Sequence, residues 1–250
     1  MESLKGMVAI ITGAAQGMGK GIAFGLAQRG VDVAICDIKE SLLMETRKEL
    51  SEATGQKIFA KKVDISNESQ VNDFVSDVEN FFGKIDILVN NAGVHPLKPI
   101  EEITSQEWDF VFNVNVKSDF FFCKAVLPGM RKRKFGRIIC ISSEAGKNGG
   151  TIAALHYAAS KGAVLGFIRN LAQQVGADGI TVNAIAPGRI ATAMAGTVSS
   201  EENQKFIDKS IIKSLGKPED VAYAVCYLAS KEASFVTAET MAVNGGTLRD

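Results

Sequence analysis

The sequence predicts an α/β fold, in which a single doubly wound parallel sheet is flanked by helices on both faces. Short apolar runs rich in Val and Ile recur along the 250 residues, and they are nearly continuous, as expected for strands buried on both faces of a parallel sheet. Longer amphipathic segments alternate with these runs, which is typical of a doubly wound fold. Apolar residues make up 46% of the chain and charged residues 22%, as in globular proteins. We expect one domain over residues 1–250.

Each predicted element corresponds to one segment of the sequence. The expected strands are the apolar runs Met7–Ile11, Val31–Cys36, Ile58–Val63, Ile85–Val89, Arg137–Ile141, Ile180–Ile185 and Thr240–Val243. The expected helices are the amphipathic segments Lys39–Ala53, Ser69–Phe82, Thr104–Lys134, Ala153–Val175 and Lys217–Ser230, together with one that follows the first strand. Residues 189–217 show no strand pattern, and long insertions of this kind are usually binding loops or lids. We therefore expect a substrate loop there.

Charge and hydropathy exclude several classes of protein. The 28 basic and 28 acidic residues give a formal net charge of zero, whereas nucleic-acid binding needs a basic surplus. The longest stretch without a charged residue, Gly6 to Gly19, has 14 residues, and a membrane span needs ~20. The apolar run at the start of the chain breaks at Gly13, so we interpret it as a buried strand and not as a signal peptide. We expect a cytoplasmic protein with no nucleic-acid or membrane partner.

The cysteines and histidines argue against a metal site. The four cysteines (Cys36, Cys123, Cys140 and Cys226) lie far apart, and three of them sit in apolar segments, as buried reduced thiols do. The chain has only two histidines, and neither belongs to an H-x-x-H or H-E-x-x-H pattern. We expect no bound metal.

The first strand runs into a glycine-rich turn at Thr12–Gly19, with the spacing GxxxGxG. Glycines allow a tight turn, and the N-terminus of the following helix presents free N–H groups to a pyrophosphate. The turn alone is a weak signal. The second strand ends in Asp37, 18 residues after Gly19, where a carboxylate can accept hydrogen bonds from ribose hydroxyls and repel the 2′-phosphate of NADP. Together they predict an NAD site.

Five further motifs follow in order along the chain. They are NNAG at 90–93, NVN at 113–115, ISS at 141–143, YAASK at 157–161 and APG at 186–188. With TGAAQGMG at 12–19, they resemble the motifs of the short-chain dehydrogenase/reductase family over the whole chain. The length of 189–216 and the closing NGG at 244–246 are similar in layout to 3-oxoacyl-carrier-protein reductases. The resemblance implies a Rossmann fold and hydride transfer between a secondary alcohol or ketone and a nicotinamide cofactor.

The resemblance also implies a catalytic set, Asn115, Ser143, Tyr157 and Lys161, with Tyr157 as acid/base. Tyr157 and Lys161 are four residues apart on a predicted helix, so we expect the ammonium to lower the pKa of the phenol. Ser143 would hydrogen-bond the substrate oxygen, and Asn115, through its carboxamide or backbone, would hold a water that relays protons to Lys161. Ser143 and Tyr157 are 14 residues apart, one more than in many relatives, which leaves Ser142 as an alternative to Ser143.

Cofactor contacts are likewise implied by the resemblance. Lys161 would bond the nicotinamide ribose, Asp64 and Ile65 would touch the adenine, and Ile190 and Thr192 would hold the carboxamide. The full expected set is Thr12, Gly13, Gln16, Gly17, Met18, Gly19, Asp37, Ile38, Asp64, Ile65, Asn91, Ala92, Gly93, Tyr157, Lys161, Pro187, Gly188, Ile190 and Thr192.

Three functions compete. The first is an NAD-dependent dehydrogenase for a secondary alcohol. The second is a 3-oxoacyl-carrier-protein reductase. Two features argue against it: Gln16 and Asp37 occupy positions where such reductases have basic residues that bind the phosphate of NADPH, and Asp178 occupies one of the two positions where docking of the carrier protein needs a basic residue. The third is a non-catalytic module that only senses NAD, which the intact catalytic set disfavours. By position in the resembling fold, the substrate would contact Ser143, Tyr157, His95, Glu144 and Arg189, and Pro96, Asn148, His156 and Met194 would also line its pocket. This polar set favours a polyol, hydroxy acid or other hydrophilic alcohol.

A homotetramer is the expected assembly. In the resembling family, the helices corresponding to Thr104–Lys134 and Ala153–Val175 pair with symmetry mates. Apolar side chains crowd both segments here, more than one domain core should cover, and an exposed apolar patch marks an interface. The residues are Phe110, Phe112, Phe120, Phe121, Phe122, Val164, Phe167 and Leu171.

Overall fold

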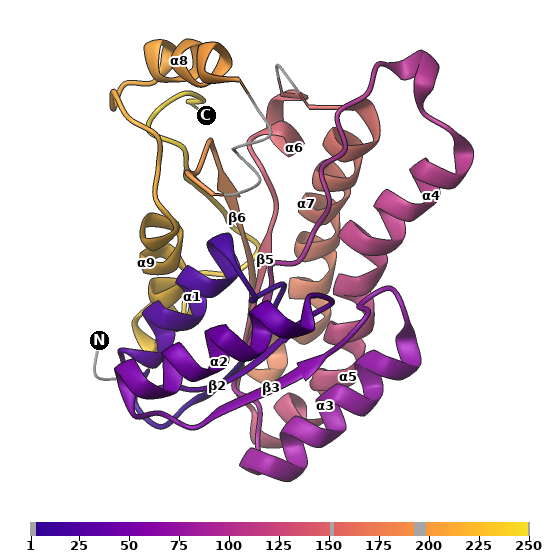
Figure 1. The fold of residues 1–250 in the computed structure, drawn as a ribbon. Coiled ribbons are helices and arrows are strands. Elements are labelled where there is room, and N and C mark those ends of the chain that lie inside the picture. The colour runs from indigo at the N-terminus through magenta and orange to yellow at the C-terminus, as the bar shows by residue number, and fades with distance from the viewer. Residues whose placement is uncertain (1–3, 151–152, 193–198, 250) are drawn as a thin grey trace.

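Seven parallel strands form one sheet, in the order β3-β2-β1-β4-β5-β6-β7 (Figure 1), in a computed structural model that describes residues 4–150, 153–192 and 199–249. The strands are β1 (Val8–Thr12), β2 (Asp32–Asp37), β3 (Ile58–Lys62), β4 (Ile87–Asn90), β5 (Gly136–Ile141), β6 (Ile180–Pro187) and β7 (Thr240–Val243). Each overlaps its predicted range, and every neighbouring pair is parallel. The predicted fold class is confirmed.

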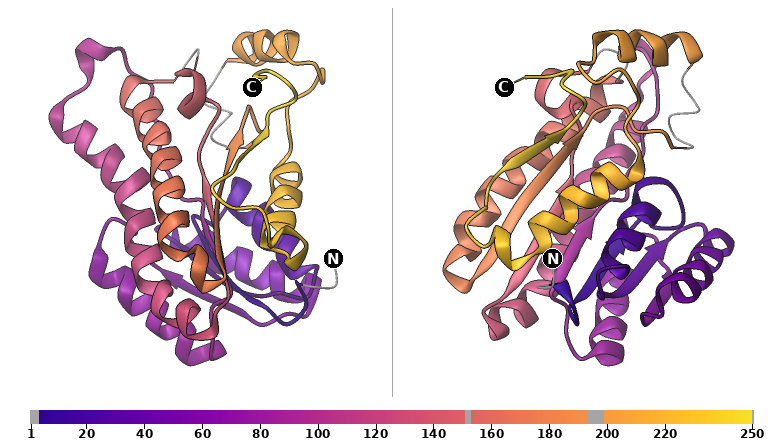
Figure 2. Two further views of the ribbon diagram at one scale, coloured as in Figure 1. Left: turned by 180° about the vertical axis from the view of Figure 1, so that it is seen from behind. Right: turned by 90° about the vertical axis from the view of Figure 1, so that its left-hand side faces the viewer.

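Helices cover both faces of the sheet, as the two views in Figure 2 show. Successive side chains of a strand point to opposite faces, so Ala9 and Ile11 of β1 pack in one core and Val8 and Ile10 in the other. The first core is closed by α1 (Gly17–Ala27), α2 (Glu40–Thr54) and α9 (Pro218–Ala229), and the second by α3 (Glu68–Phe82), α5 (Ser118–Arg133) and α7 (Leu155–Val175). Burial on both faces explains why the strands show continuous apolar runs.

The segment predicted as one helix over Thr104–Lys134 is divided into three parts. It comprises α4 (Ser105–Phe112), a π-helical turn η3 (Asn113–Lys117) and α5. π-Helical turns are rare and often mark functional sites. This one contains Asn115, so the irregularity lies at a residue of the expected catalytic set.

The insertion at 189–217 contains a helix that the sequence pattern did not predict. Helix α8 (Ser200–Lys209) begins with a reciprocal cap: the Ser199 hydroxyl accepts from the Glu202 N–H at 3.2 Å, and the Glu202 carboxylate accepts from the Ser199 N–H at 3.3 Å. Ile190 and Gly216 form a parallel bridge that brings the ends of the segment together. A short helix, α6 (Ala145–Asn148), follows β5 and was also not predicted.

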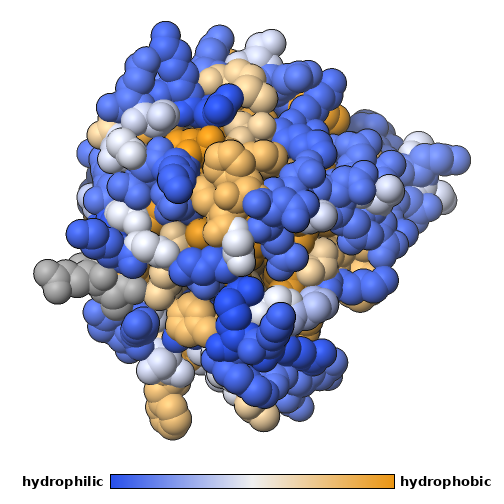
Figure 3. All heavy atoms as spheres, turned by 90° about the horizontal axis from the view of Figure 1, so that it is seen from below, coloured by the Kyte–Doolittle hydropathy of each residue, from blue (hydrophilic) through white to orange (hydrophobic). Residues whose placement is uncertain are grey.

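The chain reverses its direction of winding between β1 and β4, because β2 and β3 lie on one side of β1 and β4 to β7 on the other. Ligands of doubly wound sheets bind outside the carboxyl ends of the strands at such a point. In Figure 1 the carboxyl end of β6 points toward α8 at the top of the molecule. Figure 3 shows the molecule from below, a largely hydrophilic face crossed by a band of apolar side chains.

The apolar side chains expected to be uncovered are only partly so. Phe121, Phe122 and Val164 are buried in the core of their own chain, which corrects the expectation that one domain could not cover them. Phe110 and Phe120 remain exposed, by 52% and 46%. The uncovered apolar surface is therefore smaller than the sequence suggested.

Candidate active site

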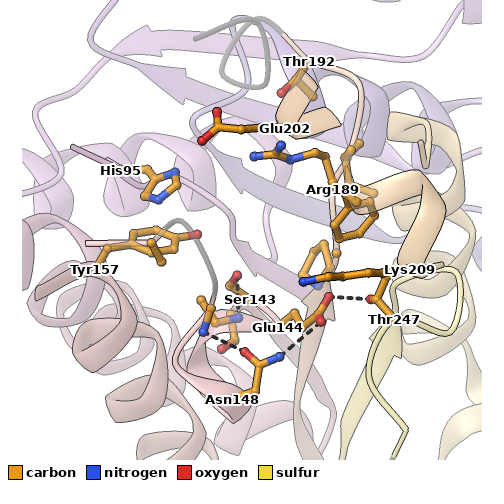
Figure 4. A pocket seen from close by; sticks show the side chains of 18 of the residues that line it. His95, Ser143, Glu144, Asn148, Tyr157, Arg189, Thr192, Glu202, Lys209 and Thr247 are labelled. Atoms are coloured by element: carbon orange, nitrogen blue, oxygen red, sulfur yellow. Dashed lines mark hydrogen bonds between the residues drawn. The ribbon is translucent and has the colours of Figure 1, made fainter. Parts of the chain in front are cut away.

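A pocket of about 580 Å³ opens between the end of β5, α7, the end of β6 and α8 (Figure 4). Ser143 and Tyr157 lie in its wall, and both their hydroxyls and the imidazole of His95 meet there. The other lining residues are Met18, Ser142, Glu144, Ala145, Asn148, Gly150, Ala153, Pro187, Gly188, Arg189, Ile190, Thr192, Glu202, Lys205, Phe206, Lys209 and Thr247. A concave site of this size with a few convergent polar groups suits a small molecule.

The Ser143 and Tyr157 side chains lie in the same part of the pocket wall (Figure 4), although 13 residues separate them in the chain. The Ser143 hydroxyl accepts from the Ala145 N–H at 3.1 Å, which fixes its position at the start of α6. Burial raises the pKa of Tyr157, and the nearby Ser143 side chain opposes that rise. The pair can hydrogen-bond one substrate oxygen and exchange a proton with it.

Ser142, the alternative to Ser143, has a structural contact instead. Its side chain is 3% exposed, and its hydroxyl donates to the backbone carbonyl of Lys161 at 2.8 Å. This bond joins the end of β5 to α7. Of the two serines, Ser143 is the one whose hydroxyl meets Tyr157.

Lys161 lies one turn beyond Tyr157 on α7 and is 5% exposed. Its ammonium donates to the Ile141 carbonyl at 2.7 Å. Burial lowers the pKa of Lys161, and the nearby Asp119 and Cys140 side chains oppose that shift. From the sequence we expected the Lys161 ammonium to lower the pKa of the Tyr157 phenol. In the structure the pKa of Tyr157 is instead influenced by burial, which raises it, and by Ser143, which lowers it.

The carboxamide of Asn115 is fully engaged by protein groups. Its oxygen accepts from the Val94 N–H at 2.8 Å, and its nitrogen donates to the Val94 carbonyl and to the Ser160 hydroxyl, both at 3.0 Å. Asn115 therefore fastens the loop after β4 to α7. Both N–H donors of the carboxamide are used in these bonds, so a water would be held by the second lone pair of its oxygen or by the backbone of the π-helical turn.

Two glycines of the glycine-rich turn have no room for a side chain. A Cβ at Gly13 would lie 2.8 Å from the Ala92 Cα, and a Cβ at Gly19 would lie 2.2 Å from the Gly13 carbonyl oxygen. Gly13 also has φ +66°, which favours glycine. Backbone packed this closely at the N-terminus of α1 fits the pyrophosphate of a dinucleotide.

Asp37 ends β2 beside this turn. One of its carboxylate oxygens accepts from the Ala15 N–H at 3.1 Å and the other from the Lys39 N–H at 2.9 Å. A carboxylate has about four lone-pair sites, so two backbone bonds fix its orientation and leave sites for ribose hydroxyls. Ile38, next to it, is 62% exposed.

Thr12 and Asn91 hold the carboxyl ends of β1 and β4 together. The Thr12 hydroxyl accepts from the N–H groups of Asn91 and Ala92, each at 3.0 Å, and the Asn91 amide donates to the Thr12 carbonyl at 2.8 Å. The Asn91 side-chain oxygen is buried with no partner among the described residues, so it is available to a bound group. Thr12 acts here as a structural link.

Four more of the expected cofactor residues lie at strand ends. Asp64 is bound locally, because its carboxylate accepts from the N–H and the hydroxyl of Ser66, and Ile65 beside it is buried. Ile190 is nearly buried in its bridge to Gly216. Thr192 lines the pocket, and a Cβ added to Gly17 would lie 3.6 Å from its side chain. The glycine-rich turn therefore lies close to Thr192 in the pocket wall.

The expected substrate residues His95, Glu144 and Arg189 all line the pocket, and so does Asn148. His156, in the first turn of α7, is fully buried and does not line the pocket, which corrects its expected place. Pro96 is absent from the described lining, and Met194 lies outside the described residues.

His95 presents a neutral ring to the pocket. Burial, then the charges of Arg189, Lys161 and His156, lower its pKa to about 4. Its Nε2 has no hydrogen-bond partner among the described residues. The ring can therefore hydrogen-bond a neutral hydroxyl or carbonyl of a substrate.

The wall formed by α8 was missed by the sequence analysis. It adds Glu202, Lys205, Phe206 and Lys209 to the pocket, and the chain end adds Thr247. The Ser199–Glu202 spacing was the signal that could have predicted this helix. The Arg189 guanidinium donates to Asn203 at 3.1 Å and faces Glu202 (Figure 4), whereas Glu144 accepts from Thr247 and Asn148.

The described residues contain neither a cluster of metal-binding side chains nor a helix that could span a membrane. No group of three or more His, Cys, Asp or Glu side chains there could hold a metal ion. No helix in the described ranges is long and apolar enough to cross a membrane.

Relatives of the chain match it over almost its whole length. A family model described as Enoyl-(Acyl carrier protein) reductase matches residues 13–247. The chain is 37% identical over 243 residues to the (2S)-[(R)-hydroxy(phenyl)methyl]succinyl-CoA dehydrogenase subunit of Thauera aromatica, covering 97% of both chains. It is also 37% identical over 244 residues to a 3-oxoacyl-[acyl-carrier-protein] reductase of Vibrio cholerae, covering 98% of both.

Two solved structures resemble this chain in fold as well as in sequence. A 3-oxoacyl-[acyl-carrier protein] reductase from Brucella melitensis superposes with a TM-score of 0.92 at 36% identity, over 98% of this chain and 92% of that one. Levodione reductase superposes with a TM-score of 0.91 at 31% identity, over 96% and 97%. With the motifs in place around the pocket, the chain belongs to the short-chain dehydrogenase/reductase family and is an oxidoreductase that acts on CH–OH and carbonyl groups with a nicotinamide cofactor.

Proposed function

We propose that this protein is an NAD(H)-dependent dehydrogenase that interconverts a hydrophilic secondary alcohol and its ketone, with Asn115, Ser143, Tyr157 and Lys161 as catalytic residues. The observation that carries the proposal is the placement of the Ser143 and Tyr157 side chains together in the wall of a polar pocket (Figure 4). Met18 of the glycine-rich turn lines the same cavity as this pair, so the expected cofactor turn and the pair share one pocket.

Each residue has a distinct task in this mechanism. When bound, the nicotinamide cofactor supplies the hydride donor or acceptor. Ser143 donates a hydrogen bond to the substrate oxygen and Tyr157 gives or takes the proton there. Lys161 would supply positive charge at the site and bond the nicotinamide ribose, and Asn115 connects the loop after β4 to α7 through Val94 and Ser160.

Asp37 supports the preference for NAD(H) over NADP(H). Two unit charges ~4 Å apart at an effective dielectric of ~20 interact by about 4 kcal/mol, and about a third of that gives tenfold discrimination against the 2′-phosphate. The two backbone bonds from Ala15 and Lys39 hold the carboxylate, so it cannot easily turn away. Lys39 is exposed at the start of α2, and its charge opposes this effect.

Fluorescence titration with NADH and NADPH tests the cofactor assignment without a known substrate. We expect the protein to bind NADH at least about tenfold more tightly than NADPH, and Asp37→Ser to remove most of that ratio. Asp32→Ser is the matched control, because Asp32 lies at the opposite end of the same strand and accepts from the Lys57 N–H. Tighter NADPH binding by the unmodified protein, or an unchanged ratio in Asp37→Ser, contradicts the assignment.

The side chains around the pocket support a hydrophilic substrate. Glu144, Asn148 and Arg189 line it together with Lys205 and Lys209 of α8. Oxidation assays with NAD⁺ over polyols, hydroxy acids, diols and hydroxysteroids test this. Turnover confined to hydroxysteroids contradicts the substrate class, and no turnover on any alcohol or ketone despite tight NADH binding favours a sensor of NAD.

A 3-oxoacyl-carrier-protein reductase is the second candidate, because relatives with that name match the chain over 98% of its length. The surface speaks against carrier docking. Asp178 accepts from Arg131 at 3.1 Å and from Lys134 at 2.5 Å, so the basic cluster at 131–134 is partly neutralised. Reduction of a carrier-bound 3-oxoacyl thioester with NADPH, faster than of any free ketone, would favour this candidate.

We also propose that residues 1–250 form one dinucleotide-binding catalytic domain, with 189–217 as its substrate loop, that assembles as a homotetramer. Exposed Phe110 and Phe120 on α4 and α5 support the assembly. All four cysteines are buried and unpaired, which supports a reducing, cytoplasmic setting.

A further inference from the structure

One buried carboxylate near the proposed catalytic lysine belongs to none of the motifs. Asp119 is in the first turn of α5, directly after the π-helical turn, and is only 5% exposed. It interacts with the Cys140 side chain near the end of β5 and, electrostatically, with Lys161 of α7, whose ammonium donates to the carbonyl of the adjacent Ile141 at 2.7 Å. A buried carboxylate is costly unless it is paired or hydrogen-bonded.

We infer that Asp119 is the buried counter-ion of Lys161 and a positioning residue for the reaction, keeping the lysine charged where the proposed mechanism needs it. The inference rests on the proposed role of Lys161, and it goes beyond the catalytic set that the motifs supply.

The charges around the pair are few. Lys161 is influenced by Asp119 and Cys140, and Asp119 by Lys161 and Cys140. The other ionisable groups near this cluster are the Cys123 thiol, which lies against Cys140, and the pocket side chains Tyr157 and His95. Asp119 is thus the acidic side chain, among those that the structure describes here, that offsets the buried ammonium.

Two thiols and an amide form a cluster beside the carboxylate. The Asn90 amide donates to the sulfur atoms of both Cys123 and Cys140, each at 3.6 Å, and Cys140 interacts with Asp119. Cys123 is one helical turn from Asp119 on α5. The cluster joins β4, β5 and α5, so Asp119 has a fixed place with respect to α7.

Two opposite pKa shifts make the pair effective at alkaline pH. Burial lowers the pKa of Lys161, which would let the lysine lose its charge as the pH rises. Burial raises the pKa of Asp119 to about 7, so the carboxylate is ionised above that pH. Asp119 therefore becomes negative in the range where Lys161 most needs a counter-ion.

The kinetic test is the pH profile of kcat for alcohol oxidation in Asp119→Asn, which keeps the shape of the side chain and removes its charge. Without the counter-ion, the pKa of Lys161 should fall further, so the alkaline limb should move to lower pH by about one unit or more. Asp86→Asn is the matched control. Asp86 is also 5% exposed and its carboxylate accepts from the Val8 N–H at 3.0 Å, at the opposite end of the sheet. Its profile should keep the position of the unmodified protein.

A stability test does not depend on activity. Urea unfolding at about pH 8 compares Asp119→Asn, Lys161→Met and the double variant, and remains possible if Asp119→Asn alone folds poorly. Lys161→Met leaves an unpaired buried carboxylate, so adding Asp119→Asn to it should raise the midpoint of unfolding. In a chain with Lys161, the same substitution should lower it.

The outcomes separate the inference from the proposed function. A shifted alkaline limb in Asp119→Asn alone, with a non-additive stability cycle, supports the inference. If the alkaline limb of Asp119→Asn is not shifted, or if the effects of the two substitutions on stability are additive, the inference is overturned. The proposed function stands in that case as long as Lys161→Met abolishes turnover. Full activity in Lys161→Met overturns the proposed role of Lys161, and the inference with it.

Discussion

The imidazole of His95 lies against the phenol of Tyr157, with ring centroids 4.0 Å apart and the ring planes at 37°. His95 comes from the loop after β4 and Tyr157 from the start of α7, so the contact brings two separate elements to one edge of the pocket. It also places a neutral hydrogen-bonding ring beside the proposed acid/base.

We predict that Tyr157→Phe loses turnover by roughly 10²–10⁴-fold and keeps its affinity for NADH. The substitution removes the hydroxyl that exchanges the proton with the substrate, but it keeps a ring to pack against His95. Steady-state kinetics and fluorescence titration of NADH measure the two quantities. A variant that retains a tenth of the normal activity would remove Tyr157 from the catalytic role.

Substitution of the two adjacent serines should have opposite effects. Ser143→Ala removes the hydroxyl that lies beside Tyr157 in the pocket wall and that would bond the substrate oxygen, so kcat should fall strongly with little change in stability. Ser142→Ala removes a buried bond to the Lys161 carbonyl, so the free energy of unfolding should fall by about 1 kcal/mol while activity persists. Urea denaturation and kcat, measured on both variants, decide the point. The reverse pattern would make Ser142 the catalytic serine.

The sequence predicted the sheet well because parallel strands buried on both faces carry continuous apolar runs. It predicted the pocket less completely, for reasons visible at single residues. His156 was expected near the substrate from its position in the resembling family, but it is fully buried, because successive residues of a helix do not share a face and only its neighbour Tyr157 lines the pocket. Asp119 has no motif, and its importance comes from the contact of α5 with β5 and α7, which no local pattern encodes.

His95 should contribute a pH dependence to stability and none to activity near neutrality. Its pKa is lowered to about 4, against 6.5 in the unfolded chain, so between these values the unfolded state binds more protons. The free energy of unfolding therefore falls as the pH drops through this window, and His95→Phe should make that fall shallower. Urea unfolding at about pH 7 and about pH 5 measures it. Equal slopes in both proteins would mean that the ring is not shielded.

His95→Phe should also weaken substrate binding. The substitution removes both ring nitrogens from a residue that lines the pocket, and one of them, Nε2, is buried with no partner among the described residues, so KM for the alcohol should rise while the affinity for NADH is kept. Steady-state kinetics with varied alcohol, beside NADH titration, separates the two. An unchanged KM would show that the substrate does not reach this ring.

The last prediction concerns assembly. Phe110 and Phe120 are exposed by 52% and 46% on α4 and α5, and Phe167 and Leu171 of α7 are only partly covered. Apolar side chains gathered on neighbouring helices mark an interface between copies of a chain. Phe110→Glu with Phe120→Glu should therefore dissociate the proposed tetramer, because two charges per chain would have to be buried without partners. Phe235→Glu is the control, since that ring is fully exposed beyond α9 and away from these helices. Analytical ultracentrifugation at micromolar protein should give a tetramer for the unmodified chain and the control, and smaller species for the double variant. A monomer in all three samples would contradict the proposed assembly.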